Sequence, residues 1–164
     1  MVKKQEVDIF KAPIDVLCHQ ANCMCTMGAG IAAEIRQRFP EAYKADCATK
    51  KGDLAKLGTF SSVYAEKKNR IDPERPLLVV NLYGQFRFGH LARYTNYEAV
   101  ARALESLRET LLAGGKGLVV GIPHKMGCSL AGGDWNVVEA IIHSVFEECP
   151  LDALICTKPE LDRQ

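Results

Sequence analysis

The sequence predicts an α/β fold, and three observations support this prediction. Short apolar stretches of strand type alternate along the chain with longer stretches whose apolar residues recur at helical spacing. No internal repeat, low-complexity tract or linker interrupts this alternation. The 164 residues, 48% of them hydrophobic and 25% charged, are enough for one core and too few for a second full domain. We therefore expect a single domain over residues 1–164, with helices on both faces of a mixed sheet.

The first predicted elements are two strands and two helices. Strands are expected over residues 7–10 and 14–20, on either side of a turn that contains Pro13. The second strand is almost entirely apolar, which is typical of a central strand covered on both faces. A helix over residues 28–39 should end before Pro40. Proline disfavours helical geometry at the residue before it but suits a first turn, so a second helix is expected from residue 41 toward residue 50.

The middle of the chain predicts two strands separated by a loop. Residues 57–66 alternate between apolar and polar side chains, as a strand does. Residues 67–76 are charged and contain two prolines, which favours an exposed loop. Residues 77–83 are apolar enough for another buried strand.

The most regular helical pattern begins at Thr95. A Thr-x-x-Glu sequence formed by Thr95 and Glu98 predicts a capping box at its start, and Gly114-Gly115 marks its end. A strand is expected over residues 117–122 and a glycine-containing loop over residues 123–133. A helix over residues 134–148 capped by Asp134 and a strand over residues 151–156 should follow, before a polar tail.

Charge and composition disfavour several classes of protein. With 21 Lys and Arg against 20 Asp and Glu, the formal net charge is +1, so the overall field does not favour binding to a nucleic-acid duplex. We expect no direct nucleic-acid binding, and any selectivity for anions must be local. No apolar run approaches the ~20 residues that span a bilayer. We therefore expect a soluble cytoplasmic protein without a membrane partner, and a small monomer by default.

The seven cysteines are an odd number scattered through apolar and glycine-rich segments, which favours reduced thiols. The spacing of Cys18, Cys23 and Cys25 differs from that of zinc fingers and ribbons, and no second pair completes four ligands. We expect no metal and no cofactor.

Two glycine-bearing loops, residues 22–30 and 127–133, each lie between a predicted strand and a predicted helix. Glycines allow a ligand to approach the main chain, and the unpaired amides of the following helical turn attract phosphate. Two such loops side by side would hold a diphosphate. Either loop alone is equally well explained as a tight turn. Neither loop matches the phosphate-binding loop of kinases or the dinucleotide fingerprint of dehydrogenases.

Four segments in the same order resemble the macrodomain family: VDIF (7–10), LCHQANC (17–23), MGAGIA (27–32) and IPHKMGCSLAGGDW (122–135). Within the family, the chain is most similar to small stand-alone proteins related to ADP-ribose 1''-phosphate phosphatases. The resemblance implies a three-layer α/β/α sandwich with a mixed central sheet of about six strands. It also implies a cleft for ADP-ribose, or a derivative of it, at the strand ends.

The resemblance also implies roles for individual residues. Asp8 and its neighbour Ile9 match the residues that hold adenine, and Asn22 matches the asparagine that faces the distal ribose. Main-chain amides of two loops match those that bind the diphosphate: Gly28, Ala29, Gly30 and Ile31 in the first, and Gly127, Cys128, Ser129, Leu130 and Ala131 in the second. Taken alone, Asp8 at a strand start is more often a surface carboxylate or turn former, and Asn22 is more often a turn residue.

The resemblance implies a catalytic set of His19, Asp134 and Asn22. His19 matches a histidine of the phosphatase-like group, and an imidazole there could act as a general acid or base. Without the resemblance, a histidine in a core strand is more often a hydrogen-bonded structural group, and Asp134 is a helix cap. The lysine used by glutamate-deconjugating relatives has no counterpart in residues 83–86, which disfavours a covalent lysine mechanism.

Three functions remain open from the sequence. The first is hydrolysis of ADP-ribose 1''-phosphate to ADP-ribose and phosphate. The second is removal of ADP-ribose from a modified protein or nucleic acid, and the third is recognition of ADP-ribose without chemistry. Arg87, His90 and Arg93 in the loop after residue 83 could meet a terminal phosphate or the acidic surface of a partner, or be solvated charges without a specific role.

Overall fold

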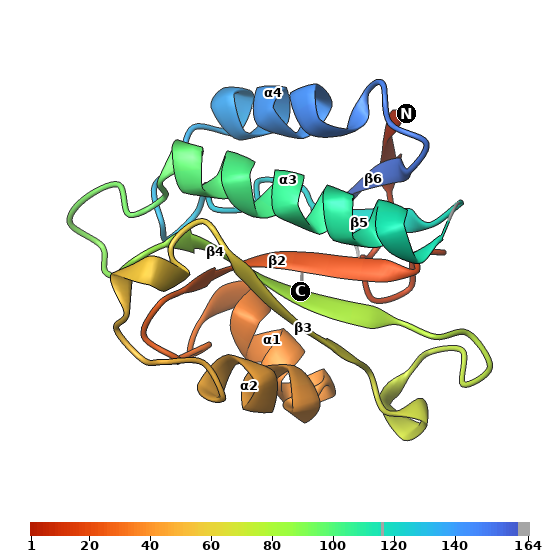
Figure 1. Ribbon diagram of the computed structural model, residues 1–164, viewed down its shortest axis with the longest axis horizontal. Coiled ribbons are helices and arrows are strands. Elements are labelled where there is room, and N and C mark those ends of the chain that lie inside the picture. The colour runs from red at the N-terminus through yellow and green to blue at the C-terminus, as the bar shows by residue number, and fades with distance from the viewer. Residues whose placement is uncertain (116, 161–164) are drawn as a thin grey trace.

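The chain folds into a six-stranded sheet between two layers of helices in a computed structural model, which describes residues 1–115 and 117–160 (Figure 1). The end of the predicted polar tail lies outside these residues. The strands are β1 (Val2–Glu6), β2 (Val16–Asn22), β3 (Phe60–Tyr64), β4 (Leu78–Gln85), β5 (Val119–Pro123) and β6 (Asp152–Thr157). The helices are α1 (Gly30–Arg38), α2 (Pro40–Cys47), α3 (Tyr97–Gly114) and α4 (Trp135–Phe146), with short 3₁₀ turns η1 (Leu54–Lys56) and η2 (Lys67–Asn69).

The sheet has the strand order β1-β6-β5-β2-β4-β3. Its pairs are parallel except for β3, which runs antiparallel to β4 at one edge. Helices α1 and α2 cover one face, and α3 and α4 cover the other (Figure 1). The predicted three-layer α/β/α sandwich with a mixed sheet of six strands is confirmed.

The central strand β2 contributes to both cores because its side chains alternate between the faces. Val16 and Cys18 pack in the core beneath α3 and α4, whereas Leu17 packs in the core beneath α1 and α2. This alternation explains why the strand is apolar along most of its length: both of its faces are covered.

The first predicted strand is placed wrongly. Strand β1 covers Val2–Glu6, and residues 7–10 form the turn that follows it. The edge strand β1 pairs only with β6 and leaves four of its five side chains exposed, so it carries no apolar alternation. In the turn, the Lys11 amide donates to the Asp8 carbonyl (2.8 Å).

The predicted capping box of α3 is also wrong. The cap is Asn96, whose side chain accepts the Ala99 amide (2.9 Å). Thr95 is buried in front of the helix, and its hydroxyl bonds to another part of the chain. The predicted end at Gly114 is confirmed, as is the Asp134 cap of α4, whose carboxylate accepts the Asn136 amide (2.9 Å).

All seven cysteines are unpaired. Within the described part of the chain, no helix has the length and hydropathy that crossing a membrane requires.

Candidate functional site

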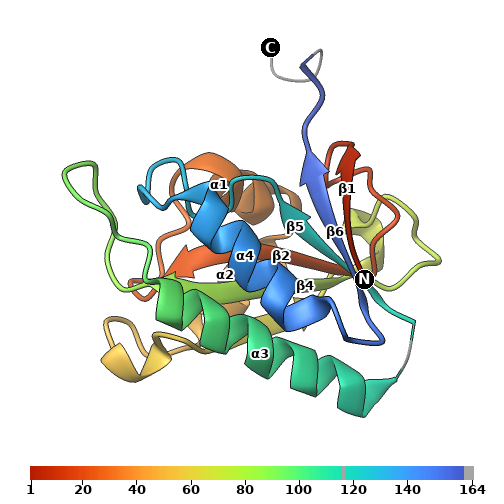
Figure 2. The same cartoon turned by 90° about the horizontal axis from the view of Figure 1, so that it is seen from above.

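A large cavity, called here the cleft, lies at the carboxyl ends of the central strands. Strands β5 and β2 are neighbours, but β2 leads into α1 on one face and β5 leads into α4 on the other (Figure 2). Connections that diverge in this way leave a crevice at the strand ends. The cleft has a volume of about 760 Å³, which is within the usual range for small-molecule sites. Its lining residues are 8–10, 20–22, 26–32, 34, 85, 88–90, 123–127, 129–131, 156 and 158.

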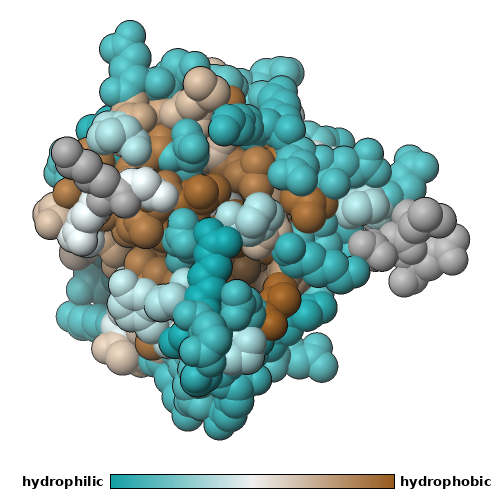
Figure 3. All heavy atoms as spheres, turned by 90° about the vertical axis from the view of Figure 1, so that its right-hand side faces the viewer, coloured by the Kyte–Doolittle hydropathy of each residue, from teal (hydrophilic) through white to brown (hydrophobic). Residues whose placement is uncertain are grey.

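The opposite end of the sheet has a different surface. Figure 3 shows the face at the amino ends of β2 and β4, where hydrophobic residues gather in the middle and hydrophilic residues surround them. The two glycine loops expected from the sequence lie at the other end, around the cleft.

Asp8 and Ile9 line one end of the cleft, as expected from the sequence. The Val7 amide extends the β1–β6 pairing by donating to the Thr157 carbonyl (2.9 Å), which places Asp8 at the end of the sheet. Asp8 is buried, and its Oδ1 accepts the Phe10 amide (3.0 Å). This bond fixes the carboxylate at the wall of the cleft. Burial, and secondly the charge of Asp8, raise the pKa of the neighbouring Cys156 thiol to about 12.

The first glycine loop contributes main-chain amides. Gly28, Ala29, Gly30 and Ile31 all line the cleft. Helix α1 starts at Gly30 without a side-chain cap, and the Ala33 amide donates to the Ala29 carbonyl (3.3 Å). The amides before Ala33 therefore have no acceptor inside the helix. The positive end of the helix dipole adds to their partial charges, so this turn is suited to an anion.

The second glycine loop contributes four of its five predicted residues to the cleft: Gly127, Ser129, Leu130 and Ala131. Cys128 is the exception. Its thiol donates to the Met126 carbonyl (3.3 Å) and packs against the core beneath α3 and α4, and its amide donates to the Lys125 carbonyl (3.0 Å). Both groups bond within the protein, and the structure does not bring Cys128 to the wall of the cleft.

Asn22 lies at the end of β2, where the pairing with β4 shifts by one residue. Its Oδ1 accepts the Met24 amide (2.8 Å), and its Nδ2 donates to the Thr26 hydroxyl (2.7 Å). These bonds fix the amide group at the wall of the cleft and use only one of its two Nδ2 hydrogens.

His19 does not lie in the cleft, although the sequence places it three residues before Asn22. It shares the face of β2 that carries Leu17, beneath α1 and α2, and is fully buried. Its Nε2 lies 2.6 Å from Oδ1 of Asn81. Asn81 uses its Nδ2 to donate to the Ala42 carbonyl and the Ser61 hydroxyl, so its Oδ1 is an acceptor and His19 Nε2 carries the hydrogen.

Burial lowers the pKa of His19 to about 4, so the ring is neutral near pH 7. Within the described residues its Nδ1 has no hydrogen-bond partner. The structure therefore does not bring the predicted catalytic His19 to its expected place.

Asp134 is also absent from the lining of the cleft. It is exposed at the start of α4, where its carboxylate caps the helix and its main-chain amide donates to the Tyr97 hydroxyl (2.9 Å). The predicted pair of His19 and Asp134 is therefore not formed. Of the three predicted catalytic residues, the structure places only Asn22 in the cleft.

The cleft contains polar residues that the sequence did not assign. Gln20 follows His19 on the opposite face of β2, and Gln85 ends β4. Phe88 and His90 come from the loop between β4 and α3, which projects from the same end of the sheet (Figure 2). The sequence did carry a signal for Gln20: successive residues of a strand point to opposite faces, so His19 and Gln20 could not both face the cleft. Nothing in the sequence showed that the loop after β4 borders the cleft.

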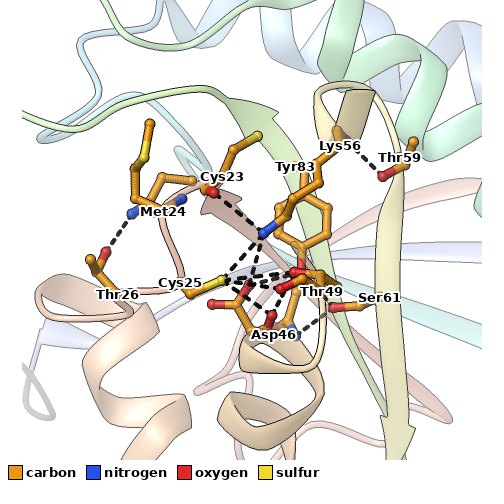
Figure 4. Close-up of polar contacts among 12 residues, drawn as sticks. Cys23, Met24, Cys25, Thr26, Asp46, Thr49, Lys56, Thr59, Ser61 and Tyr83 are labelled. Carbon is orange, nitrogen blue, oxygen red and sulfur yellow. Dashed lines mark hydrogen bonds and ion pairs between the residues drawn. The ribbon is translucent and has the colours of Figure 1, made fainter. Parts of the chain in front are cut away.

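A buried polar cluster supports the first glycine loop from behind (Figure 4). The Lys56 ammonium donates to the Cys23 carbonyl (3.3 Å) and to the Cys25 sulfur (3.4 Å). It also lies 3.8 Å from Asp46 Oδ1, which accepts the Tyr83 hydroxyl (2.8 Å). Burial raises the pKa of Asp46, and the Tyr83 hydrogen bond and the Lys56 charge oppose this rise. One lysine thus connects the segment after β2 to α2 and β4.

Comparison with known proteins gives two similar sequences, although no family model matches the chain. An uncharacterized 17.5 kDa protein from the tk-vs intergenic region of Enterobacteria phage T4 is 32% identical over 127 residues, which are 77% of this chain and 76% of that protein. A DNA ADP-ribosyl glycohydrolase of Mycobacterium bovis is 25% identical over 150 residues. That match covers 90% of this chain but only 40% of the mycobacterial protein.

Solved structures share the fold over nearly the whole chain. The macrodomain of Mycobacterium tuberculosis DarG superposes with a TM-score of 0.77 at 23% identity, covering 98% of this chain and 99% of that one. Thermosipho africanus DarTG in complex with ADP-ribose gives a TM-score of 0.75 at 17% identity, covering 99% of this chain and 43% of that one.

Proposed function

The chain belongs to the macrodomain family, and we propose that it binds ADP-ribose in the cleft and hydrolyses a derivative that carries a substituent on the distal ribose. One observation carries this proposal: two loops present main-chain amides to one cleft that has the buried carboxylate of Asp8 at one end. A buried acceptor and a main-chain site for a diphosphate suit the two ends of an adenosine diphosphate group.

The ligand would lie with adenine at Asp8 and the distal ribose at Asn22. The carboxylate of Asp8 accepts the adenine amino group, and Ile9 packs against the ring. The amides of residues 28–31 and those of Ser129, Leu130 and Ala131 bind the diphosphate, so its charge is neutralised without a metal or a cofactor. The solved complex of Thermosipho africanus DarTG with ADP-ribose supports this choice of ligand.

The chemistry we propose is attack by water on ADP-ribose 1''-phosphate. Water attacks phosphorus, the bond from phosphorus to the ribose oxygen breaks, and the products are ADP-ribose and inorganic phosphate. Because His19 and Asp134 do not line the cleft, Asn22 and the loop amides position the water and stabilise the developing charge. Of the predicted catalytic set, this mechanism retains Asn22, whose amide group is fixed by two hydrogen bonds.

Removal of ADP-ribose from a macromolecule is the second candidate, and the rim of the cleft favours it. The loop between β4 and α3 exposes Arg87, Phe88, His90 and Arg93, and no acidic residue occurs between Arg75 and Tyr97. Such a rim suits an anionic acceptor that carries the ADP-ribosyl group. The similar mycobacterial protein is named a DNA ADP-ribosyl glycohydrolase. A reader without chemistry would bind ADP-ribose and release nothing.

Calorimetric titration and product analysis test these proposals in sequence. We expect heat of binding with ADP-ribose, and no heat at millimolar ligand would refute the binding site. Release of inorganic phosphate from ADP-ribose 1''-phosphate would support the first reaction. Release of ADP-ribose from a modified single-stranded oligonucleotide or protein, without phosphate release, would instead support the second. Binding without either product identifies a reader.

The proposed role of Asn22 gives the catalytic reaction its own test. Asn22→Ala should lower turnover about 10²-fold, which is the usual loss when one donor to a developing charge is removed, and should leave ADP-ribose affinity within a few-fold. Asn69→Ala serves as the control, because it removes an asparagine amide that donates to Glu41 (3.0 Å) outside the cleft, and its turnover should equal that of the wild type. Unchanged turnover in Asn22→Ala would contradict this mechanism.

A further inference from the structure

The second glycine loop is attached to the rest of the fold mainly through Thr95. The Thr95 hydroxyl donates to the Gly127 carbonyl (2.6 Å). The main-chain amides of Tyr94 and Thr95 both donate to the Ala131 carbonyl (2.8 and 3.1 Å). One residue in front of α3 therefore contacts the loop at Gly127 and at Ala131, which are its first and last predicted ligand-binding positions.

The Thr95 hydroxyl has a defined direction because Gln20 fixes it. Gln20 Nε2 donates to Thr95 Oγ1 (2.9 Å) and to Gln85 Oε1 (2.8 Å). The hydroxyl accepts from Gln20, so its single hydrogen is available for the Gly127 carbonyl. Thr95 is only 2% exposed, and water therefore does not compete for this hydrogen bond.

The packing around Thr95 leaves no room for a side chain at two glycines of the loop. Gly127 has a φ of 71°, and a side chain there would overlap Gln20 and the Thr95 hydroxyl. A Cβ on Gly133 would lie 2.6 Å from the Gly127 carbonyl oxygen and 3.3 Å from Thr95. The Gly133 amide donates to that same carbonyl (2.9 Å), so Gly127 is bonded from two sides.

We propose that Thr95 is a positioning residue for the second glycine loop, and that its hydroxyl holds the amides of Ser129, Leu130 and Ala131 in the geometry that binds a diphosphate. This inference rests on the proposed function. Thr95 does not line the cleft, so it acts through the loop and not by contact with the ligand. Gln20, whose Oε1 has no hydrogen-bond partner within the described residues, orients the Thr95 hydroxyl from below.

Two pairs of variants isolate the hydroxyl group. Thr95→Val keeps the shape of threonine but removes the hydrogen bond. Thr95→Ser and Thr95→Ala both lack the methyl group and differ from each other only in the hydroxyl. We expect Thr95→Val and Thr95→Ala to weaken ADP-ribose binding about tenfold, the effect of losing one hydrogen bond, and Thr95→Ser to stay within about threefold of the wild type.

Adenosine separates a positioning role from a general structural one. Adenosine binds at the Asp8 end but has no diphosphate, so its affinity should be equal in all four proteins. Thr59→Val is the matched control, because its hydroxyl also donates to a carbonyl at 2.6 Å, that of Lys56, outside the cleft. This control should bind ADP-ribose like the wild type. An equal loss of adenosine and ADP-ribose affinity in Thr95→Val would refute the positioning role.

Hydrogen exchange tests the loop without a ligand. In Thr95→Val and Thr95→Ala, the Gly133 amide should exchange at least about tenfold faster, because its acceptor carbonyl is no longer fixed, whereas in Thr95→Ser it should remain protected. Unchanged exchange in a folded Thr95→Ala would overturn the inference even if ADP-ribose binding failed in the wild type. Absence of binding in the wild type, together with the expected exchange, would refute the proposed function alone.

Discussion

Whether a single residue can reach the cleft depends on the strand face or turn on which it lies. Asp8 is buried in a turn at the cleft, whereas His19 is buried on the face of β2 directed away from it. Both were expected to meet the ligand, and only Asp8 lines the cavity. We therefore expect replacement of Asp8 to weaken ligand binding and replacement of His19 to leave it unchanged.

Replacing Asp8 should weaken ligand binding. Asp8→Asn keeps an acceptor for the Phe10 amide but removes the charge, and we expect ADP-ribose affinity to fall by about 1.5 to 3 kcal/mol, the range for a hydrogen bond to a charged group. Isothermal titration calorimetry measures this loss. Asp53→Asn is the matched control, because Asp53 makes the same kind of turn at the Ala55 amide (2.9 Å) outside the cleft. Equal affinity in both variants would disprove the assignment of adenine to Asp8.

Replacing His19 should change the pH dependence of stability and not the binding. The pKa of His19 is lowered from 6.5 to about 4 in the folded state, so between these values the unfolded chain binds more protons. The free energy of unfolding should therefore fall as the pH falls from 6.5 to 4, with a slope of up to about 1.4 kcal/mol per pH unit from this residue. His19→Gln keeps a donor toward Asn81 and should lack this component.

Denaturant unfolding at several pH values checks the expectation for His19. His143→Gln is the control, because His143 is exposed on α4. ADP-ribose affinity and turnover in His19→Gln should stay within a few-fold of the wild type at pH 7. A large loss of turnover in a stably folded His19→Gln would show that the histidine acts in the cleft after all.

At the scale of elements, each glycine loop depends on a support that lies behind it. The segment after β2 is held by Lys56 from η1, and the second loop by Thr95 in front of α3. Both supports are buried side chains that bond to main-chain carbonyls. Both glycine loops are thus held in place by hydrogen bonds from neighbouring elements.

Replacing Lys56 tests the support of the first loop. Lys56→Met keeps the length of the side chain but leaves the Asp46 carboxylate buried without its cation, and we expect a loss of about 3 kcal/mol in unfolding free energy. The double variant Lys56→Met/Asp46→Asn should recover part of this loss, because no uncompensated charge remains. Thermal or denaturant unfolding provides the measurement.

An exposed ion pair offers the control for Lys56. Lys67→Met should have almost no effect on the free energy of unfolding, since Lys67 and Glu74 lie on the surface. Equal stability of the two single variants would contradict a role of Lys56 in the fold.

At the scale of the whole molecule, the cleft results from the order of the strands. Parallel strands align their carboxyl ends, and the connections after β5 and β2 diverge to opposite faces of the sheet. The two glycine loops, residues 22–30 and 127–133, lie far apart in the sequence yet border one cavity. If main-chain amides neutralise the diphosphate, as we propose, the whole site requires no added ion.

Removal of metals tests this view of the whole site. We expect a chelator to leave both ADP-ribose affinity and turnover unchanged, because backbone dipoles supply the positive potential. Titration and product release with and without a chelator provide the measurement. Loss of activity that is restored by one divalent cation would show that the amides alone do not suffice.

The sequence by itself determined the α/β class, most helices and strands, the two glycine loops and the positions of Asp8 and Asn22. The elements and the glycine loops follow from local periodicity and glycine placement, which neighbouring residues specify, whereas the roles of Asp8 and Asn22 follow from the resemblance to macrodomains. Only the tertiary structure decided that β1 covers residues 2–6, because an exposed edge strand leaves no periodic pattern. It alone separated His19 from the cleft and brought Gln20, Gln85 and Thr95 together behind the second loop. Such placements depend on which strands pair and which face each connection crosses, and these are contacts between residues far apart in the chain.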